Sequence, residues 1–205
     1  MSYVSIREAT PLLGKDLILE KRMKRISDIM ANHGAKSALY KVVAGDGAGR
    51  YDLQNWYASL EEAANSFQSY GADPDYQEMM NMRAADPIAD VVGPWIGRMA
   101  YGAPKGIKPV VVHRDYHAPR SALATALELA PQLDALMAEI DVEIGIGVPI
   151  MKNDHEMLRI VYRFNSLTHW GQCVDKMIAD ERFAKLVSDA HEAATLKTSR
   201  MLVLK

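Results

Sequence analysis

The stretch Trp56-Tyr57-Ala58-Ser59-Leu60-Glu61-Glu62 decides the fold, because it joins a strand to a helix and recurs in the second half of the chain. Adding 107 to each number leads to Arg163-Phe164-Asn165-Ser166-Leu167-Thr168-His169, with an aromatic residue, the serine and the leucine in equivalent places. Ser59 and Glu62 have the spacing of a capping box, which opens a helix. The same offset, without gaps, relates Arg7 to Arg114, Met30 to Met137, Ala72-Asp73 to Ala179-Asp180 and Tyr76 to Phe183. The 205-residue sequence therefore predicts two similar units, 1–104 and 105–205.

Each unit is predicted to have the element order β-α-β-β-α-β. In the first unit the predicted strands are 3–8, 36–44, 50–58 and 95–101. One predicted helix carries the apolar stripe Leu19, Met23, Ile26 and Met30. A second helix follows Ser59, and a further helix start is predicted at Asp73-Pro74. In the second unit the predicted strands are 110–117, 143–151, 158–165 and 200–204, with a helix at 121–140 and one long helix after Ser166. Pro131 should kink or shorten the helix that contains it.

This element order is ferredoxin-like, with helices on one face of a four-stranded antiparallel sheet. The other face of each sheet needs cover, and two such sheets in one chain can cover each other. We therefore predict an α+β fold that arises from a tandem duplication. Its two antiparallel sheets should pack face to face as an α+β barrel.

Composition and charge limit the classes of partner. Hydrophobic residues make up 49% and charged residues 24% of the chain, which is typical of a globular protein. The net charge of −2 argues against nucleic acid or an anionic membrane as a partner, and no apolar run approaches the ~20 residues needed to span a bilayer. The N-terminal residues lack a signal-peptide layout, and one cysteine, Cys173, fits a reducing compartment. We expect a cytoplasmic monomer or homodimer that binds a small molecule.

The two helix-start motifs resemble those of the dimeric α+β barrel superfamily, within it the NIPSNAP-like and antibiotic-biosynthesis-monooxygenase-like groups. The resemblance is carried by residues 56–62 and by Ala72-Asp73-Pro74-Asp75-Tyr76-Gln77, with their second-half versions at 164–167 and 179–183. It implies a ligand cavity between sheet and helices or inside the barrel. Members include cofactor-free oxygenases, muconolactone-type isomerases and haem enzymes, most of them dimers of one unit. The motifs are helix caps, so they select no activity.

Strand parity sorts candidate ligand-binding residues. The series expected to pack against the helices is Leu158, Ile160, Tyr162 and Phe164. The series expected to face the other sheet is Met157, Arg159, Val161 and Arg163, which the offset matches to Arg50, Asp52, Gln54 and Trp56. Polar and aromatic residues on a covered face make Trp56, Arg159 and Arg163 candidates for ligand binding. Alternatively, the arginines pair with Asp52 or another acid across the interface, or lie at a sheet edge.

Two glycines on the neighbouring strand extend this candidate site. Gly145 and Gly147 share one face of the strand, where the first half has Ala38 and Tyr40. Glycines leave space that side chains would otherwise fill, and this space would suit a small anionic or aromatic ligand. Alternatively, the glycines permit close backbone packing or a twisted strand.

The densest polar cluster is His113-Arg114-Asp115-Tyr116-His117. His113 and His117 share a strand face, and imidazole can act as general acid or base, so both are candidate catalytic residues, with Arg114 as a candidate ligand-binding residue. The first half has Ile6 and Thr10 at the two histidine positions. Alternatively, the cluster is a solvated turn.

No histidine pair has the helical spacing of a zinc enzyme, so no metal site is predicted. A haem would need one axial histidine in a deep apolar pocket, for which His113, His169 or His191 could serve. We expect no bound cofactor.

Two functions stay open at this point. One is a cofactor-independent monooxygenase or isomerase acting on a small organic substrate, in which His113, His117 or an arginine handles a proton or an enolate-like anion. The alternative is a non-catalytic ligand-binding or NIPSNAP-like protein. A buried pocket where a histidine and an arginine converge would favour the enzyme, whereas a filled interior would favour the alternative.

Overall fold

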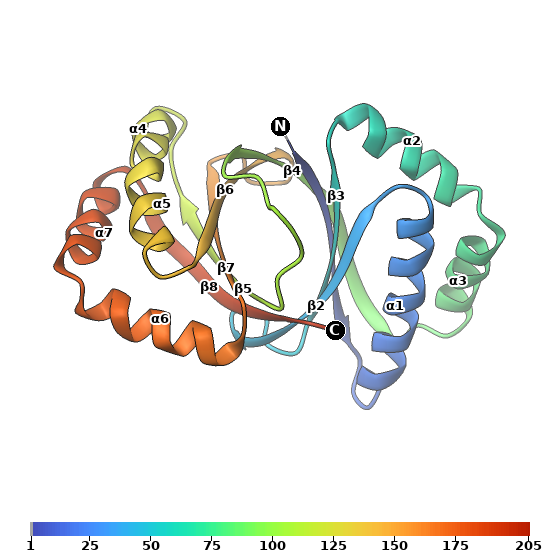
Figure 1. Cartoon of the computed structure of the whole chain (residues 1–205). Coiled ribbons are helices and arrows are strands. Elements are labelled where there is room, and N and C mark those ends of the chain that lie inside the picture. Colours follow the sequence, from blue (N-terminus) through green and yellow to red (C-terminus); the bar gives the residue numbers. More distant parts are fainter. Residues whose placement is uncertain (1) are drawn as a thin grey trace.

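The computed structural model describes residues 2–205, and its elements follow the predicted order in both halves (Figure 1). The first half consists of β1 (Tyr3–Pro11), α1 (Asp16–Asn32), β2 (Lys36–Gly45), β3 (Tyr51–Tyr57), α2 (Leu60–Gly71), α3 (Pro74–Ala85) and β4 (Ala89–Tyr101). The second half consists of β5 (Val110–His117), α4 (Leu123–Glu128), α5 (Ala130–Ala138), β6 (Glu143–Met151), β7 (Met157–Phe164), α6 (Leu167–Ala179), α7 (Glu181–Ala193) and β8 (Thr195–Leu204).

The 107-residue offset holds for these elements. Five elements of the first half, namely β1, α1, β2, α2 and α3, begin 107 residues before β5, α4, β6, α6 and α7. The remaining two, β3 and β4, begin within one residue of the same offset from β7 and β8. Equivalent caps explain the agreement between the starts of α2 and α6, because Ser59 Oγ accepts the Glu62 N–H at 3.0 Å and Ser166 Oγ accepts the His169 N–H at 3.0 Å.

The eight strands form one closed antiparallel barrel in the order β1-β3-β2-β8-β5-β7-β6-β4. Within each half the four strands are neighbours in the ferredoxin-like order. The two sheets join at two seams, where β2 pairs with β8 and β4 pairs with β6. Helices α1–α3 cover one side of the barrel and α4–α7 the other (Figure 1). The predicted α+β barrel is confirmed, and its two sheets are continuous with each other. The division at residue 104 stays a prediction.

Four predicted boundaries differ from the structure. The helix predicted at 121–140 is two helices that meet at Leu129, because the ring of Pro131 prevents a continuous helix, as expected. The single long helix predicted after Ser166 divides at Asp180, whose side chain caps α7 by accepting the Arg182 N–H. Strands β4 and β8 begin earlier than predicted because they pair with β1 and β5 along nearly their whole length.

Apolar side chains from both halves form cores between the barrel and its helices. In the first half this core includes Met30, Leu53 and Tyr70, and in the second half it includes Phe164 and Met137. The apolar series that includes Tyr162 and Phe164 faces the helices, as predicted. No helix within residues 2–205 has the length and apolar character needed to cross a membrane.

Candidate functional site

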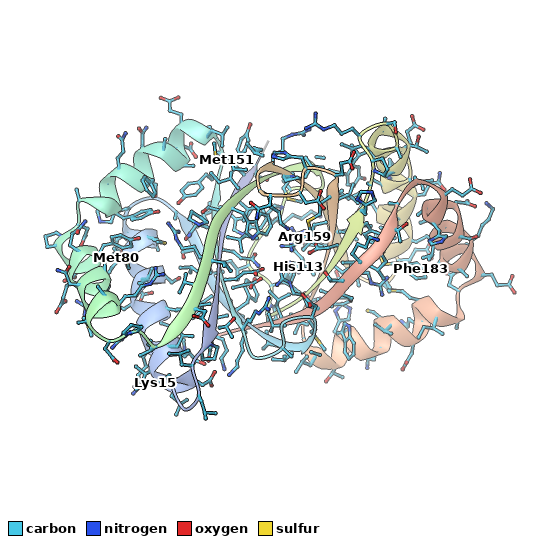
Figure 2. The ribbon with its side chains drawn as sticks, turned by 180° about the vertical axis from the view of Figure 1, so that it is seen from behind. Lys15, Met80, His113, Met151, Arg159 and Phe183 are labelled. Carbon is cyan, nitrogen blue, oxygen red and sulfur yellow. The ribbon has the colours of Figure 1, made fainter. Side chains whose placement is uncertain are left out.

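Charged and polar side chains occupy the inside of the barrel. His113 and Arg159 lie between the two layers of helices, whereas Met80 and Phe183 lie outward among the helices on opposite sides (Figure 2). The side chains of His113 and Arg159 come from β5 and β7, which pair directly. Both residues are buried, with exposed fractions of 2% and 6%. The face of β5 and β7 that was expected to point into the barrel therefore carries buried polar side chains.

Two ion pairs organise this interior. Arg159 donates from Nε to Asp115 Oδ1 at 2.5 Å and from Nη2 to Asp115 Oδ2 at 2.7 Å, and the two residues are opposite each other on β7 and β5. Arg200 on β8 donates from Nη2 to Glu8 Oε1 at 2.6 Å and lies 3.9 Å from Asp52 Oδ2. Arg159 therefore pairs with an acid, but this acid is Asp115 on the neighbouring strand of the same sheet and not Asp52 or another acid across the interface.

Burial and neighbouring charge shift the pKa values of two interior groups in opposite senses. Burial, reinforced by the guanidinium groups of Arg159, Arg200 and Arg163, holds the pKa of His113 well below its ordinary value. Burial raises the pKa of Asp52 to about 6, against the opposing effect of Arg200. His113 is therefore neutral at pH 7, and Asp52 changes its charge in mildly acidic solution.

A cavity of about 30 Å³ lies inside the barrel. It brings together four of the predicted site residues, Trp56, His113, Gly147 and Arg159. It is also lined by residues that were not predicted as site residues, including Gln54, Trp95 and Lys152. Lys152 Nζ and the Arg159 guanidinium lie 4.8 and 4.7 Å from the centroid of the Trp95 ring. Because one water needs roughly 10–15 Å³, this cavity has room for about two.

The structure does not bring the other predicted residues to this cavity. The expected space beside Gly145 is absent, because a side chain there would meet Met99, Arg163 and the Gly102 carbonyl oxygen. Close packing against these neighbours therefore explains why residue 145 is a glycine. Arg163 is buried near Gly145, and burial lowers the pKa of its guanidinium. His117, at the end of β5, lines neither this cavity nor the cavity between sheet and helices in either half of the chain.

Arg114 points away from His113, to the helix side of β5, where it lines a different cavity. Each half has such a cavity between its sheet and its helices, at matching positions. The first-half cavity measures about 80 Å³ and the second-half cavity about 160 Å³. The larger volume follows from smaller side chains, because the offset replaces Leu19 by Ala126, Met23 by Ala130, Met80 by Val187 and Arg83 by Ala190.

The equivalent arginines of the two cavities have different partners. Arg7 Nη2 donates to Tyr70 Oη at 2.8 Å, whereas the residue equivalent to Tyr70 in the second half is Met177. The guanidinium carbon of Arg114 lies 5.3 Å from the centroid of the Tyr162 ring, and Arg114 forms no ion pair with an acid of residues 2–205. Each arginine therefore contacts a tyrosine and has no acidic partner among residues 2–205, so the two cavities differ mainly in volume and in the other residues that line them.

The second-half cavity has a histidine that the first lacks. His191 on α7 lines it, and the first-half equivalent is Ala84. A haem does not fit this site, because about 160 Å³ is well below the roughly 300–1,000 Å³ of pockets that hold molecules of drug size. Residues 2–205 also contain no cluster of three histidine, cysteine or acidic side chains placed to hold a metal ion.

A serine, a histidine and an aspartate also meet at the surface of the first half. His33 Nδ1 lies 2.6 Å from Ser69 Oγ, and His33 Nε2 lies 2.7 Å from Asp73 Oδ2. Asp73 Oδ1 already accepts the N–H groups of Asp75 and Tyr76 at the start of α3. The group therefore ties together the ends of three helices, which is a structural role.

Comparison with known proteins identifies the fold. No family model and no curated protein matches the sequence. A "putative monooxygenase" from Fusobacterium nucleatum subsp. nucleatum superposes with a TM-score of 0.68 at 6% identity, over 100% of this chain and 93% of that chain. An anthrone oxidase-like protein gives 0.65 at 12% identity, over 99% and 91%. A haem-degrading enzyme from Listeria monocytogenes gives 0.52 at 11% identity, over 99% of both chains.

These similarities extend over both halves of the chain, so the fold that the resemblance implied, an α+β barrel with two ferredoxin-like units in one polypeptide, is confirmed. Identities of 6–12% establish the fold alone. The activity has to be argued from the cavities themselves.

Proposed function

We propose that the protein binds a single-ring phenolic or enolisable compound in the second-half cavity and catalyses its oxygenation or isomerisation without a bound cofactor. The observation that carries this proposal is Arg114, a cation with no acidic partner among residues 2–205, in the wall of a cavity that is mainly apolar and also has His191 in its lining. An anionic oxygen on the ligand would supply the missing negative charge.

The volume of the cavity supports a ligand of this size. An apolar cavity of about 150 Å³ is large enough to bind benzene, and the second-half cavity measures about 160 Å³. Leu133, Leu158, Ile160 and Leu186 provide the apolar contacts that an aromatic ring or a short carbon skeleton requires. The first-half cavity, at about 80 Å³, is too small for the same ligand.

The reaction that we propose passes through an enolate or phenolate anion. His191 accepts the proton of the substrate, and Arg114 stabilises the oxygen that becomes negative. In an isomerisation the proton returns from His191 to a different atom of the substrate. In an oxygenation the same anion forms a carbon–oxygen bond with dissolved O₂, which is thereby reduced to a peroxide and takes up the proton held by His191. The neighbours described as a monooxygenase and as anthrone oxidase-like support the second route, although the cavity here favours a smaller molecule than anthrone.

The experiment uses catechol and phenylpyruvate as probes, one phenolic and one enolisable. Ligand-observed NMR measures binding, an oxygen electrode measures oxygenation, and ultraviolet absorbance measures the keto–enol conversion of phenylpyruvate. Arg114→Met should weaken binding at least tenfold, because the charged contact is lost. Arg7→Met, at the equivalent position of the first half, is the matched control and should bind the probes like the wild type. Binding that is equal in the two variants would contradict the proposal.

A specific observation favours a non-catalytic carrier as the second candidate. The barrel interior is largely filled by its own ion pairs, which is the arrangement expected of that alternative. A carrier would bind the probes through Arg114 but would not convert them, and His191→Ala would leave binding unchanged. An enzyme would lose turnover in His191→Ala while it keeps most of its affinity.

A further inference from the structure

Three buried donors inside the barrel have no hydrogen-bond partner among residues 2–205. They are Gln54 Nε2 on β3, His113 Nδ1 on β5 and Arg159 Nη1 on β7. The three residues are exposed by only 3%, 2% and 6%, and all of them line the same cavity of about 30 Å³. Folded proteins leave few buried polar groups unsatisfied, so three of them around one small space require an explanation.

The orientation of Arg159 leaves one of its donors free for this cavity. Asp115, on the neighbouring strand, accepts from Nε and Nη2 of Arg159, and these two bonds fix the plane of the guanidinium group. Nη1 is the remaining nitrogen, and the structure gives it no acceptor. The geometry is that of a positioned donor, because a bidentate ion pair restricts the rotation of the side chain.

The charges around the cavity favour an anion. Glu8 is hydrogen-bonded to Arg200 and Asp115 to Arg159, and Asp52 lies next to Arg200. Lys152 also lines the cavity, and within residues 2–205 no carboxylate lies within 4.0 Å of its ammonium group. Its nearest contacts are Met157 Sδ at 2.8 Å and the Trp95 ring. The three acids and three cations are equal in number, but the acids lie against Arg159 and Arg200, which leaves the charge of Lys152 without a direct partner among residues 2–205.

We propose that the barrel interior binds one small monovalent inorganic anion, of the size of bromide or nitrate, between Gln54, His113 and Arg159. A volume of about 30 Å³ holds roughly two waters and excludes an organic ligand, so this site is separate from the second-half cavity. The neutral His113 donates from Nδ1, and Lys152 in the cavity wall supplies positive charge. This inference does not depend on the proposed function.

The test compares thermal unfolding in sodium nitrate and in sodium gluconate at equal ionic strength, because gluconate is too large for the cavity. At nitrate concentrations about tenfold above the dissociation constant, the midpoint should rise by roughly 3–6 °C, and each further tenfold increase in nitrate should add a similar rise. Gln54→Leu removes one donor and should abolish most of this rise. Asn55→Leu is the matched control, since Asn55 is the next residue on β3 but contacts Met30 on the helix side.

General effects of nitrate on stability act on every variant alike, so the decisive quantity is the difference between the two leucine variants. An equal nitrate response in Gln54→Leu and Asn55→Leu would overturn the proposal, as would a wild type whose midpoint is no higher in nitrate than in gluconate. Crystals soaked in bromide provide a second readout. An anomalous peak between Gln54, His113 and Arg159 supports the site, whereas bromide found only at the surface shows that water alone satisfies these donors.

Discussion

The two halves of the molecule have the same frame but differ in what their sheet–helix cavities contain. The first half fills its cavity with Leu19, Met23, Met80 and Arg83, and it satisfies Arg7 with the Tyr70 hydroxyl. The second half has smaller side chains at the same four positions, and it leaves Arg114 beside an open apolar space. Helix caps and the apolar faces of strands maintain the fold in both halves. The side-chain volume inside the cavity therefore differs between the halves, although the strand order is the same and α1 is replaced by the shorter helices α4 and α5.

The largest expected effect concerns the equivalent acids Glu8 and Asp115. Asp115→Ala leaves Arg159 buried without a partner and should lower the free energy of unfolding by about 3–5 kcal/mol. Glu8→Ala should cost less, because Asp52 still lies 3.9 Å from Arg200. Urea denaturation of both variants measures the difference. Equal losses would show that the two ion pairs contribute alike and that the halves do not differ in this respect.

Exchanging the cavity residues between the halves should have the next largest effect. Met23→Ala removes buried side-chain volume from the first half and should cost about 2–4 kcal/mol in urea denaturation. The reverse change, Ala130→Met, places the first-half residue in the second-half cavity. It should reduce probe binding at least tenfold and cost no more than about 1–3 kcal/mol of stability. A variant that still binds the probes with wild-type affinity would argue that the ligand lies elsewhere.

The pH dependence of stability should distinguish Asp52 in the first half from Asp115 in the second. The pKa of Asp52 is raised from 3.8 to about 6, so its stabilising contribution is complete in acid and is lost as the pH rises through 6. Asp52→Asn should therefore gain about 1–3 kcal/mol relative to the wild type between pH 4 and 7. Hydrogen bonds from Arg159 hold the pKa of Asp115 below 3.8, against the effect of burial, so Asp115→Asn should show no such change over this range. Denaturation curves at several pH values test both expectations.

The smallest effect should come from the equivalent helix caps. Ser59→Ala and Ser166→Ala each remove one side-chain acceptor from a helix start and should each cost about 1 kcal/mol. A second bond completes each cap. Glu62 Oε2 accepts the N–H of Ala58 in the first half, and His169 Nδ1 accepts the N–H of Asn165 in the second. Thermal unfolding of the two serine variants should give similar midpoints. A clearly larger loss in one half would mean that its cap also supports tertiary packing.

Local chemistry explains why the fold could be predicted from the sequence. The capping residues Ser59, Asp73 and Ser166 act on their own helix ends, and strand parity assigned Tyr162 and Phe164 to the helix side. The offset itself also carried a signal for the larger cavity, since Ala126 and Ala130 replace Leu19 and Met23 along an aligned helical stripe.

The candidate sites depended on contacts between distant segments. Arg159 finds Asp115 through the register between β7 and β5, which no local pattern reveals. Trp95 and Lys152 come together only because β4 and β6 close the barrel. Arg114 was grouped with its sequence neighbours His113 and His117, although strand alternation places it on the opposite face.

The closed ring also has a consequence for how the chain folds during synthesis. Strand β8, the last of the eight, lies between β2 of the first half and β5 of the second. Until β8 has been made, β2 has an unpaired edge, and such edges are sites of aggregation. The edge of β2 therefore stays unpaired until about the last hundred residues have been synthesised. Slow translation would lengthen the time during which this edge can aggregate. Chaperones that cover strand edges would therefore matter most for the N-terminal half.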